Sequence, residues 1–193
     1  MLFRSLIATY KSDNQQELQP PKAYPEKKEL NQPENIEAFQ NDWKALKDTH
    51  DFFGLLEKHN LNRHKSMYYA PEGMVRKIDN EHVRSMLIQA AENQVPIMAF
   101  VGNKGTIQIH SGVIRRVVDA RGWLNVLDPE FNLHLNDKAF FETFVVRKPA
   151  EGDVIHSLEV YNEQGDLIVQ FFGARKPGEP ELQEWRYLLD NLN

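Results

Sequence analysis

The chain has 193 residues, of which 41% are hydrophobic and 26% charged, a composition typical of a globular protein with one substantial core. Its 23 Lys and Arg against 28 Asp and Glu give a formal charge of -5, which excludes the bulk positive charge that non-specific nucleic-acid binding needs. The absence of cysteine excludes disulfides, thiolate zinc sites, iron–sulfur clusters and cysteine nucleophiles, and fits a reducing compartment.

Apolar runs in the sequence are short. The run over 95–101 falls far below the length of about 20 residues that a bilayer-spanning helix needs. Residues 1–10 lack the apolar stretch and the small-residue cleavage site of a signal peptide. We therefore expect a cytoplasmic protein with no membrane insertion and no nucleic-acid partner.

The first 32 residues are predicted to lie outside the packed domain. Residues 1–10 form an amphipathic helix without a core of its own, and residues 11–32 are polar and proline-containing, as an extended linker is. The pattern aromatic, Arg, any, Leu, aliphatic at 3–7 recurs at 185–189. Either the chain begins with the last helix of a preceding copy of the same domain, or the two helices are unrelated. The domain itself is expected over 33–193.

Helices are predicted from Asn31 to Asn93. With Asn31 as the N-cap, one helix face carries Ile36, Phe39, Trp43 and Leu46, and the same count extends this apolar stripe to His50 and Phe53. Asn62 is the predicted cap of a short helix over 63–69, and Asp79 that of a helix reaching Ala91.

Beyond Asn93 the hydrophobic period changes from about 3.6 to about 2, which predicts strands. Segments 95–101 and 106–110 flank a turn at 102–105 and form a β-hairpin. Further strands are expected over 113–118, 123–127, 131–135, 144–148, 154–161 and 167–173, and a closing helix over 181–192. This order favours an α+β fold in which N-terminal helices pack on a large antiparallel sheet and a C-terminal helix closes the domain.

His50 is the first candidate for chemistry, because an imidazole on an apolar stripe needs a partner if it is buried. One interpretation is a locally hydrogen-bonded histidine in the core or at a helix end. The other is a single axial ligand to a haem iron, bound through one neutral imidazole nitrogen against an apolar wall. The sequence contains no common hydrolase or nucleotide-binding motif that would point to another reaction.

Cationic side chains gather near the predicted strand ends, in the segments 147–148 and 175–176, and at 63–65 beside a helix. Such cations usually form a solvated rim. Here Gln170 and Phe172 alternate on one face of the strand that leads into Arg175. A planar apolar ligand with carboxylates would bind aromatic residues under its plane and Arg or Lys at its edge.

Five stretches resemble the haem-utilisation proteins called HemS, ChuS and HmuS: 43–53 (WKALKDTHDFF), 96–103 (PIMAFVGN), 123–135 (WLNVLDPEFNLHL), 145–149 (VVRKP) and 170–173 (QFFG). They occur in the order found in the C-terminal half of that family, and the likeness runs from about Phe39 to the end of the chain. Full-length members carry two copies of one domain, so the resemblance implies that residues 1–10 are the last helix of a missing first copy.

The resemblance also implies a haem site. His50 would bind the iron, and Met98 and Phe100 would line the porphyrin face. The remaining contacts to haem would come from Arg63, Lys148, Gln170, Phe172 and Arg175. Some relatives have tyrosine in place of Phe172, so a hydroxyl contact is lost here. The first copy supplies a distal arginine in the family, so this chain alone offers only the proximal side.

The expected function is that of a cytoplasmic haem-binding domain that handles imported haem for degradation and iron release. Its partners would be haem, an external reductase, a haem-import system, and either a second copy of the chain or the missing half. One alternative is a carrier or storage protein that does not consume haem. Another is a structural module that has lost haem binding. No residue is uniquely needed for ring cleavage, so the sequence leaves carrier and enzyme both open.

Overall fold

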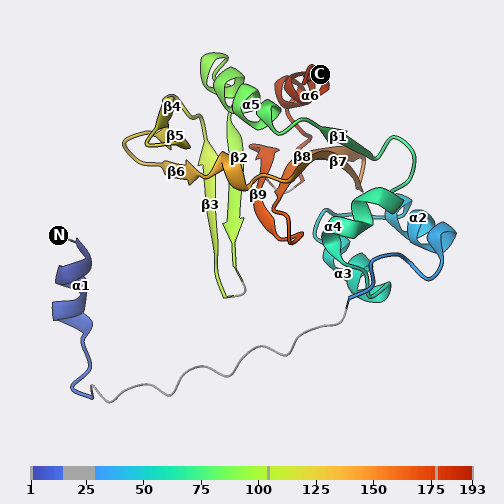
Figure 1. The fold of residues 1–193 in the computed structure, drawn as a ribbon, viewed down its shortest axis with the longest axis horizontal. Helices are drawn as coiled ribbons and strands as arrows, with labels where there is room; N and C mark the ends of the chain where they lie inside the picture. The colour runs from blue at the N-terminus through green and yellow to red at the C-terminus, as the bar shows by residue number, and fades with distance from the viewer. Residues whose placement is uncertain (1, 15–28, 104, 177, 193) are drawn as a thin grey trace.

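The computed structural model describes residues 2–14, 29–103, 105–176 and 178–192 (Figure 1). The helices within these ranges are α1 (Leu2–Tyr10), α2 (Ile36–Lys44), α3 (Asp51–Lys58), α4 (Arg63–Ser66), α5 (Glu81–Glu92) and α6 (Gln183–Asp190), with short 3-10 turns η1 (Met67–Tyr69) and η2 (Asp137–Ala139). The strands are β1 (Val75–Ile78), β2 (Ile97–Gly102), β3 (Ile107–Gly112), β4 (Val117–Ala120), β5 (Trp123–Leu127), β6 (Asn132–Leu135), β7 (Glu142–Ala150), β8 (Asp153–Tyr161) and β9 (Leu167–Gly173).

Two antiparallel sheets organise the fold. The larger sheet has the order β1-β7-β8-β9-β2-β3, and the smaller one has the order β4-β5-β6. The predicted α+β class, the hairpin of β2 and β3, and the closing helix are confirmed. Residues 2–10 form the expected helix, whereas 15–28 of the predicted linker lie outside the described residues. No helix in the described part of the chain is long and apolar enough to cross a bilayer.

The two faces of the larger sheet carry separate cores. On β7, Val145 packs into the core formed with α5, α6 and the smaller sheet, whereas Phe144 and Val146 pack into the core formed with α2 and α3. Neighbouring residues of a strand point to opposite faces, so the two cores lie on opposite sides of the sheet. In Figure 1, α2, α3 and α4 gather near β7 and β1, while the β2–β3 hairpin lies apart from them on the other side of β9.

The predicted long helical stripe through His50 is wrong. Helix α2 begins after Asn35, whose side chain accepts a hydrogen bond from the Ala38 N–H, so Asn35 rather than Asn31 is the cap. The helix ends at Lys44, and α3 starts anew at Asp51. Between them the Asp48 carboxylate accepts the backbone N–H of His50, a local bond that competes with helical hydrogen bonding. His50 therefore leaves the stripe, and its side chain is 93% exposed.

Other boundaries also differ from the sequence-based expectation. Asn62 does cap α4, because its side chain accepts the Lys65 N–H. Helix α5 begins after Asn80 rather than Asp79, and the Asn80 amide donates to the Phe140 carbonyl instead of capping the helix. The strand expected over 113–118 lies at 117–120, and the short edge strand β1 was not predicted.

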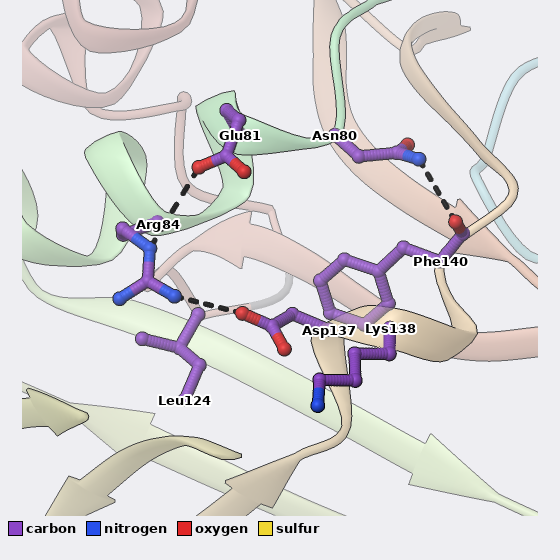
Figure 2. A pocket seen from close by; sticks show the side chains of 7 residues that line it. All are labelled: Asn80, Glu81, Arg84, Leu124, Asp137, Lys138 and Phe140. Carbon is purple, nitrogen blue, oxygen red and sulfur yellow. Dashed lines mark hydrogen bonds and ion pairs between the residues drawn. The ribbon is translucent and has the colours of Figure 1, made fainter. Parts of the chain in front are cut away.

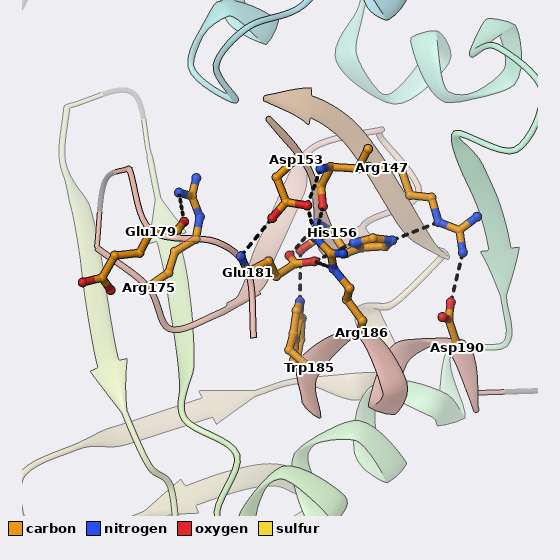
Figure 3. A network of polar contacts seen from close by, with 10 residues as sticks. Arg147, Asp153, His156, Arg175, Glu179, Glu181, Trp185, Arg186 and Asp190 are labelled. Carbon is orange, nitrogen blue, oxygen red and sulfur yellow. Dashed lines mark hydrogen bonds and ion pairs between the residues drawn. The ribbon is translucent and has the colours of Figure 1, made fainter. Parts of the chain in front are cut away.

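A polar network holds α6 against the sheet (Figure 3). The Glu181 carboxylate accepts the backbone N–H and Nδ1 of His156 and the Nε of Arg186, at 2.7, 2.6 and 2.9 Å. Arg147 donates its Nε to Nε2 of His156 at 3.0 Å, so Nε2 accepts and the ring proton lies on Nδ1. This network also buries Trp185, whose indole N–H donates to the His156 carbonyl at 3.0 Å.

Gly173 is required by the close approach of Trp185. A Cβ at this position would lie 2.8 Å from Cβ and Cγ of that side chain, which is fully buried. We expect Gly173→Ala to lower the free energy of unfolding by about 1–3 kcal/mol, as overpacking does. Urea unfolding measures this loss. Gly54→Ala is the matched control: its Cβ meets nothing within 4 Å in α3, and we expect a gain of about 0.5–1 kcal/mol. Equal effects of the two substitutions would contradict the packing argument.

Candidate functional site

The strand register brings four of the predicted haem contacts onto one face of the larger sheet. Met98 pairs with Phe172, and Phe100 pairs with Gln170, so these side chains lie next to each other on β2 and β9. The Phe100 and Phe172 rings meet edge to face, with centroids 5.4 Å apart. On β2 the alternate residues, including Ile97 and Ala99, are buried in the core on the opposite face.

This face continues onto β3 as an uncovered apolar surface. Ile109 pairs with Phe100, and Ile107 pairs with Gly102, and the two isoleucines are 57% and 58% exposed. We call this surface the apolar strip; it consists of Met98, Phe100, Ile107, Ile109 and Phe172. A contiguous patch of exposed apolar side chains is typical of a binding surface.

A buried carboxylate on β8 gathers the polar members of the predicted site. Glu159 is 0% exposed and pairs with Gln170 in the sheet register. It accepts hydrogen bonds from Arg63 Nε and Nη2 at 3.1 and 2.9 Å, from Lys148 Nζ at 2.6 Å and from Gln170 Nε2 at 2.8 Å. The hydroxyls of Ser157 and Tyr161 also donate to it, at 3.1 and 2.6 Å. Three residues predicted as separate haem contacts are therefore parts of one network, the Glu159 cluster.

Helix α3 closes the Glu159 cluster with an aromatic ring. Lys148 Nζ lies 4.5 Å from the centroid of Phe52, and the Arg63 guanidinium carbon lies 5.1 Å from it. Both cations are thus stabilised by the negative face of the ring as well as by the carboxylate. Phe52 is two residues after His50, so α3 connects the cluster with the predicted iron ligand.

Burial and charge set the ionisation of the Glu159 cluster. Burial alone would raise the pKa of Glu159, but the charges of Arg63 and Lys148 outweigh it and hold that pKa well below its usual range. Burial lowers the pKa of Lys148 to about 8; the carboxylate opposes this shift, and Arg63 adds to it. At neutral pH two cations face one carboxylate, so the cluster has one positive charge in excess.

His50 is the N-cap residue of α3, and Asp48 orients its ring. The Nδ1 atom lies 2.5 Å from the Asp48 carboxylate. The pKa of Asp48 is lowered, first by the hydrogen bond from the His50 backbone N–H and then by the bond from the ring. A carboxylate only accepts, so the Nδ1 carries the proton, and the Nε2 lone pair of the neutral ring is left for another partner. A histidine ligand of a metal is commonly fixed in this way.

Arg175 lies outside the Glu159 cluster. It follows the end of β9, and its Nη1 donates to the Glu179 carbonyl at 3.4 Å (Figure 3). The positive charge of Arg175 adds the smallest contribution to the lowered pKa of Asp48. Arg175 is half-buried, whereas Lys148 is buried.

Sequence reasoning missed Glu159, Asp48 and Phe52. A glutamate in the middle of a strand is usually read as facing solvent. The available signal was the spacing of Ser157, Glu159 and Tyr161, which places three polar side chains on one face of a strand whose other residues are mostly apolar. Asp48 and Phe52 lie within the stretch 43–53, but their contacts depend on the turn between α2 and α3.

A separate hollow of about 300 Å³ lies between α5, β5 and η2 (Figure 2). Three of its charged groups are paired: Arg84 lies 2.7 Å from Asp137 and 3.8 Å from Glu81. Asn80 at its edge donates to the Phe140 carbonyl at 2.9 Å. None of the predicted haem contacts lines this hollow, so it is distinct from the apolar strip.

Comparison with known proteins identifies the family. Residues 60–192 match the model of the haemin-degrading HemS/ChuX domain. The chain is 36% identical over 157 residues to the hemin transport protein HemS of Yersinia enterocolitica, covering 81% of this chain and 46% of that protein. The fold superposes on holo-PhuS, a heme-binding protein from Pseudomonas aeruginosa, with a TM-score of 0.88 and 38% identity, covering 99% of this chain and 56% of the other.

A second solved structure is that of ChuS, an E. coli heme oxygenase, with a TM-score of 0.83 and 32% identity over 98% of this chain and 56% of the other. The chain spans about half the length of these relatives. The length of the family match and the identity to HemS agree with the motifs found in the sequence, and the chain belongs to the family of haemin-degrading HemS/ChuX domains.

Proposed function

We propose that this chain binds haem on the apolar strip, with the iron held by His50 and the propionates by the Glu159 cluster and Arg175. The observation that carries the proposal is an uncovered apolar strip bordered by a cluster with one positive charge in excess. A porphyrin is a planar apolar ring with two carboxylates at its edge, and it needs both features. Burial of the ring would remove Phe100 and Phe172 from water, at about 25 cal/mol for each Å² covered.

The residues fit the ligand in chemistry. The Asp48 carboxylate holds the His50 ring through Nδ1, which leaves Nε2 as the nitrogen that would bind iron, a common arrangement for a histidine ligand. Lys148, Arg63 and Gln170 offer charged and neutral donors to a carboxylate. When bound, the haem would supply the reactive iron, and the residues of this chain would bind and orient it.

We further propose that the chain acts in the cytoplasm on imported haem, as one step toward its degradation and the release of iron. Two relatives favour different roles, since HemS is described as a hemin transport protein and ChuS as a heme oxygenase. An enzyme would need electrons from an external reductase, and a haem-import system would supply the ligand. A carrier that does not consume haem is therefore the second candidate.

The first test is a titration of the protein with haem, followed by the Soret band. We expect a shifted band that saturates as haem is added. If the wild type produces no shift, the haem-binding proposal is wrong, and a structural or partner-binding role is favoured. Adding a reductant and O2 to the complex then separates the two roles. Loss of the Soret band with release of iron or CO identifies an enzyme, and a persistent band identifies a carrier.

Self-association is expected on haem binding. One sheet face covers one side of the porphyrin, so the other side would remain as an exposed apolar surface. The relatives are about twice as long, and a further domain would fill that place in them. For the 193-residue chain alone we expect a second copy to close over the ligand, because a ligand that favours the dimer shifts the equilibrium toward it. Sedimentation velocity with and without haem checks this, and a monomer at saturating haem would contradict it.

A further inference from the structure

The Glu159 carboxylate at the centre of the Glu159 cluster is negatively charged, as are the carboxylates of the ligand that it would face. Simple electrostatics predicts that such a group weakens their binding. We propose the opposite, that Glu159 is a positioning residue that strengthens carboxylate binding by keeping Lys148 charged and by holding Arg63 and Gln170 in place. This inference rests on the proposed haem site and names the residue that organises it.

Lys148 depends on Glu159 for its charge. The Lys148 side chain is 3% exposed, and a buried ammonium loses the hydration that favours its charged form. Its Nζ donates to Glu159 and to the Ser157 hydroxyl of β8, and the Phe52 ring of α3 lies 4.5 Å away. The Arg63 cation of α4 and the neutral Tyr161 hydroxyl of β8 bind the same carboxylate. Without the carboxylate, both burial and Arg63 would favour the neutral amine. Removal of the negative charge would therefore remove a positive charge as well.

Glu159 also fixes the orientation of the other two donors. Its carboxylate accepts hydrogen bonds from Nε and Nη2 of Arg63, which fixes the plane of a guanidinium whose side chain is 29% exposed. Glu159 also accepts a hydrogen bond from the Gln170 amide at 2.8 Å, and Gln170 pairs with Phe100 in the strand register. Donors that are already oriented lose less conformational entropy when a ligand binds.

Metal-free protoporphyrin IX is the probe that isolates this effect, because it has both carboxylates and no iron for His50. Its dimethyl ester has the same ring without the charges. We expect Glu159→Gln to weaken the diacid about tenfold at neutral pH, the effect of one charge-assisted hydrogen bond, and to leave the ester unchanged. In the wild type, affinity for the diacid should fall as the pH rises through about 8, where Lys148 loses its proton. Fluorescence titration of both porphyrins measures these affinities.

A double-mutant cycle shows whether Glu159 acts through Lys148. Lys148→Met should weaken the diacid and abolish the fall near pH 8, and adding Glu159→Gln should then cause little further loss. Glu181→Gln is the matched control, since this buried carboxylate pairs with His156 and Arg186 in the α6 network and should leave porphyrin binding unchanged. Thermal unfolding checks each fold. If Glu159→Gln does not fold, the comparison of pH profiles between wild type and Lys148→Met decides.

Tighter diacid binding in Glu159→Gln, or equal losses for the diacid and the ester, would overturn the inference and leave the haem proposal standing. A wild-type profile without a fall near pH 8 would overturn it too. If the wild type binds neither porphyrin nor haem, the proposed function fails, and the role of Glu159 fails with it.

Discussion

Glu159→Leu is expected to lower the free energy of unfolding by about 3–5 kcal/mol, the typical cost of removing one partner of a buried ion pair. The substitution leaves Lys148 in an apolar site without a counter-charge and leaves the hydroxyl of Tyr161 without its acceptor. Arg63 suffers less, because its side chain is 29% exposed and is able to turn toward solvent. Urea unfolding followed by circular dichroism measures the loss.

The second substitution of the test removes the buried amine that has lost its carboxylate partner. In the double variant Glu159→Leu/Lys148→Met the site loses both charges of the pair and keeps similar volume. Replacing a buried pair by apolar residues is often close to neutral, so we expect the double variant to recover most of the lost stability. If the stability lost in the double variant equals the sum of the losses in Glu159→Leu and Lys148→Met, the two side chains do not stabilise each other.

The sequence predicted what depends on periodicity and not what depends on distant partners. The period of a strand is a local property, and it is sufficient to place Gln170 and Phe172 on one face of β9. Met98 and Phe100 were expected from the family resemblance, and only the register of the folded sheet brings β2 beside β9. Glu159 is different. Its partner Arg63 is 96 positions away in the chain, and only the folded sheet brings α4 over β8.

His50 shows a second way in which a local pattern misleads. The spacing from Ile36 to Leu46 is helical and extends to His50 by arithmetic, yet the helix ends at Lys44. The Asp48 carboxylate provides the alternative, because its bonds to the backbone and ring of His50 stabilise a turn. The motif that suggested a buried imidazole instead encodes an exposed one with its proton on Nδ1. An exposed imidazole is open to an iron that arrives from solvent, whereas an imidazole in the core would not be.

His50→Ala is expected to abolish the spectrum of histidine-ligated haem, because no other imidazole is proposed to reach the iron. The apolar strip and the Glu159 cluster remain, so the variant should still bind metal-free protoporphyrin IX with wild-type affinity. Asp48→Asn should keep the His50 ligand but weaken the orientation of its ring, and we expect a loss of about 10–100-fold in haem affinity, as for other hydrogen-bond partners of metal-bound histidines. Absorption spectra and titrations of haem and metal-free porphyrin, side by side, separate the contribution of the iron from that of the ring.

His134→Ala is the matched control for His50→Ala. The ring of His134 is held at 2.6 Å by Asn125 on the smaller sheet, and the residue is exposed in the same way as His50. Its loss should leave the haem spectrum unchanged, because the smaller sheet contributes no residue to the apolar strip. An unchanged spectrum in His50→Ala together with a lost one in His134→Ala would move the iron to the other sheet. The apolar strip would then have no axial ligand beside it, and both the assignment of His50 and the orienting role of Asp48 would be wrong.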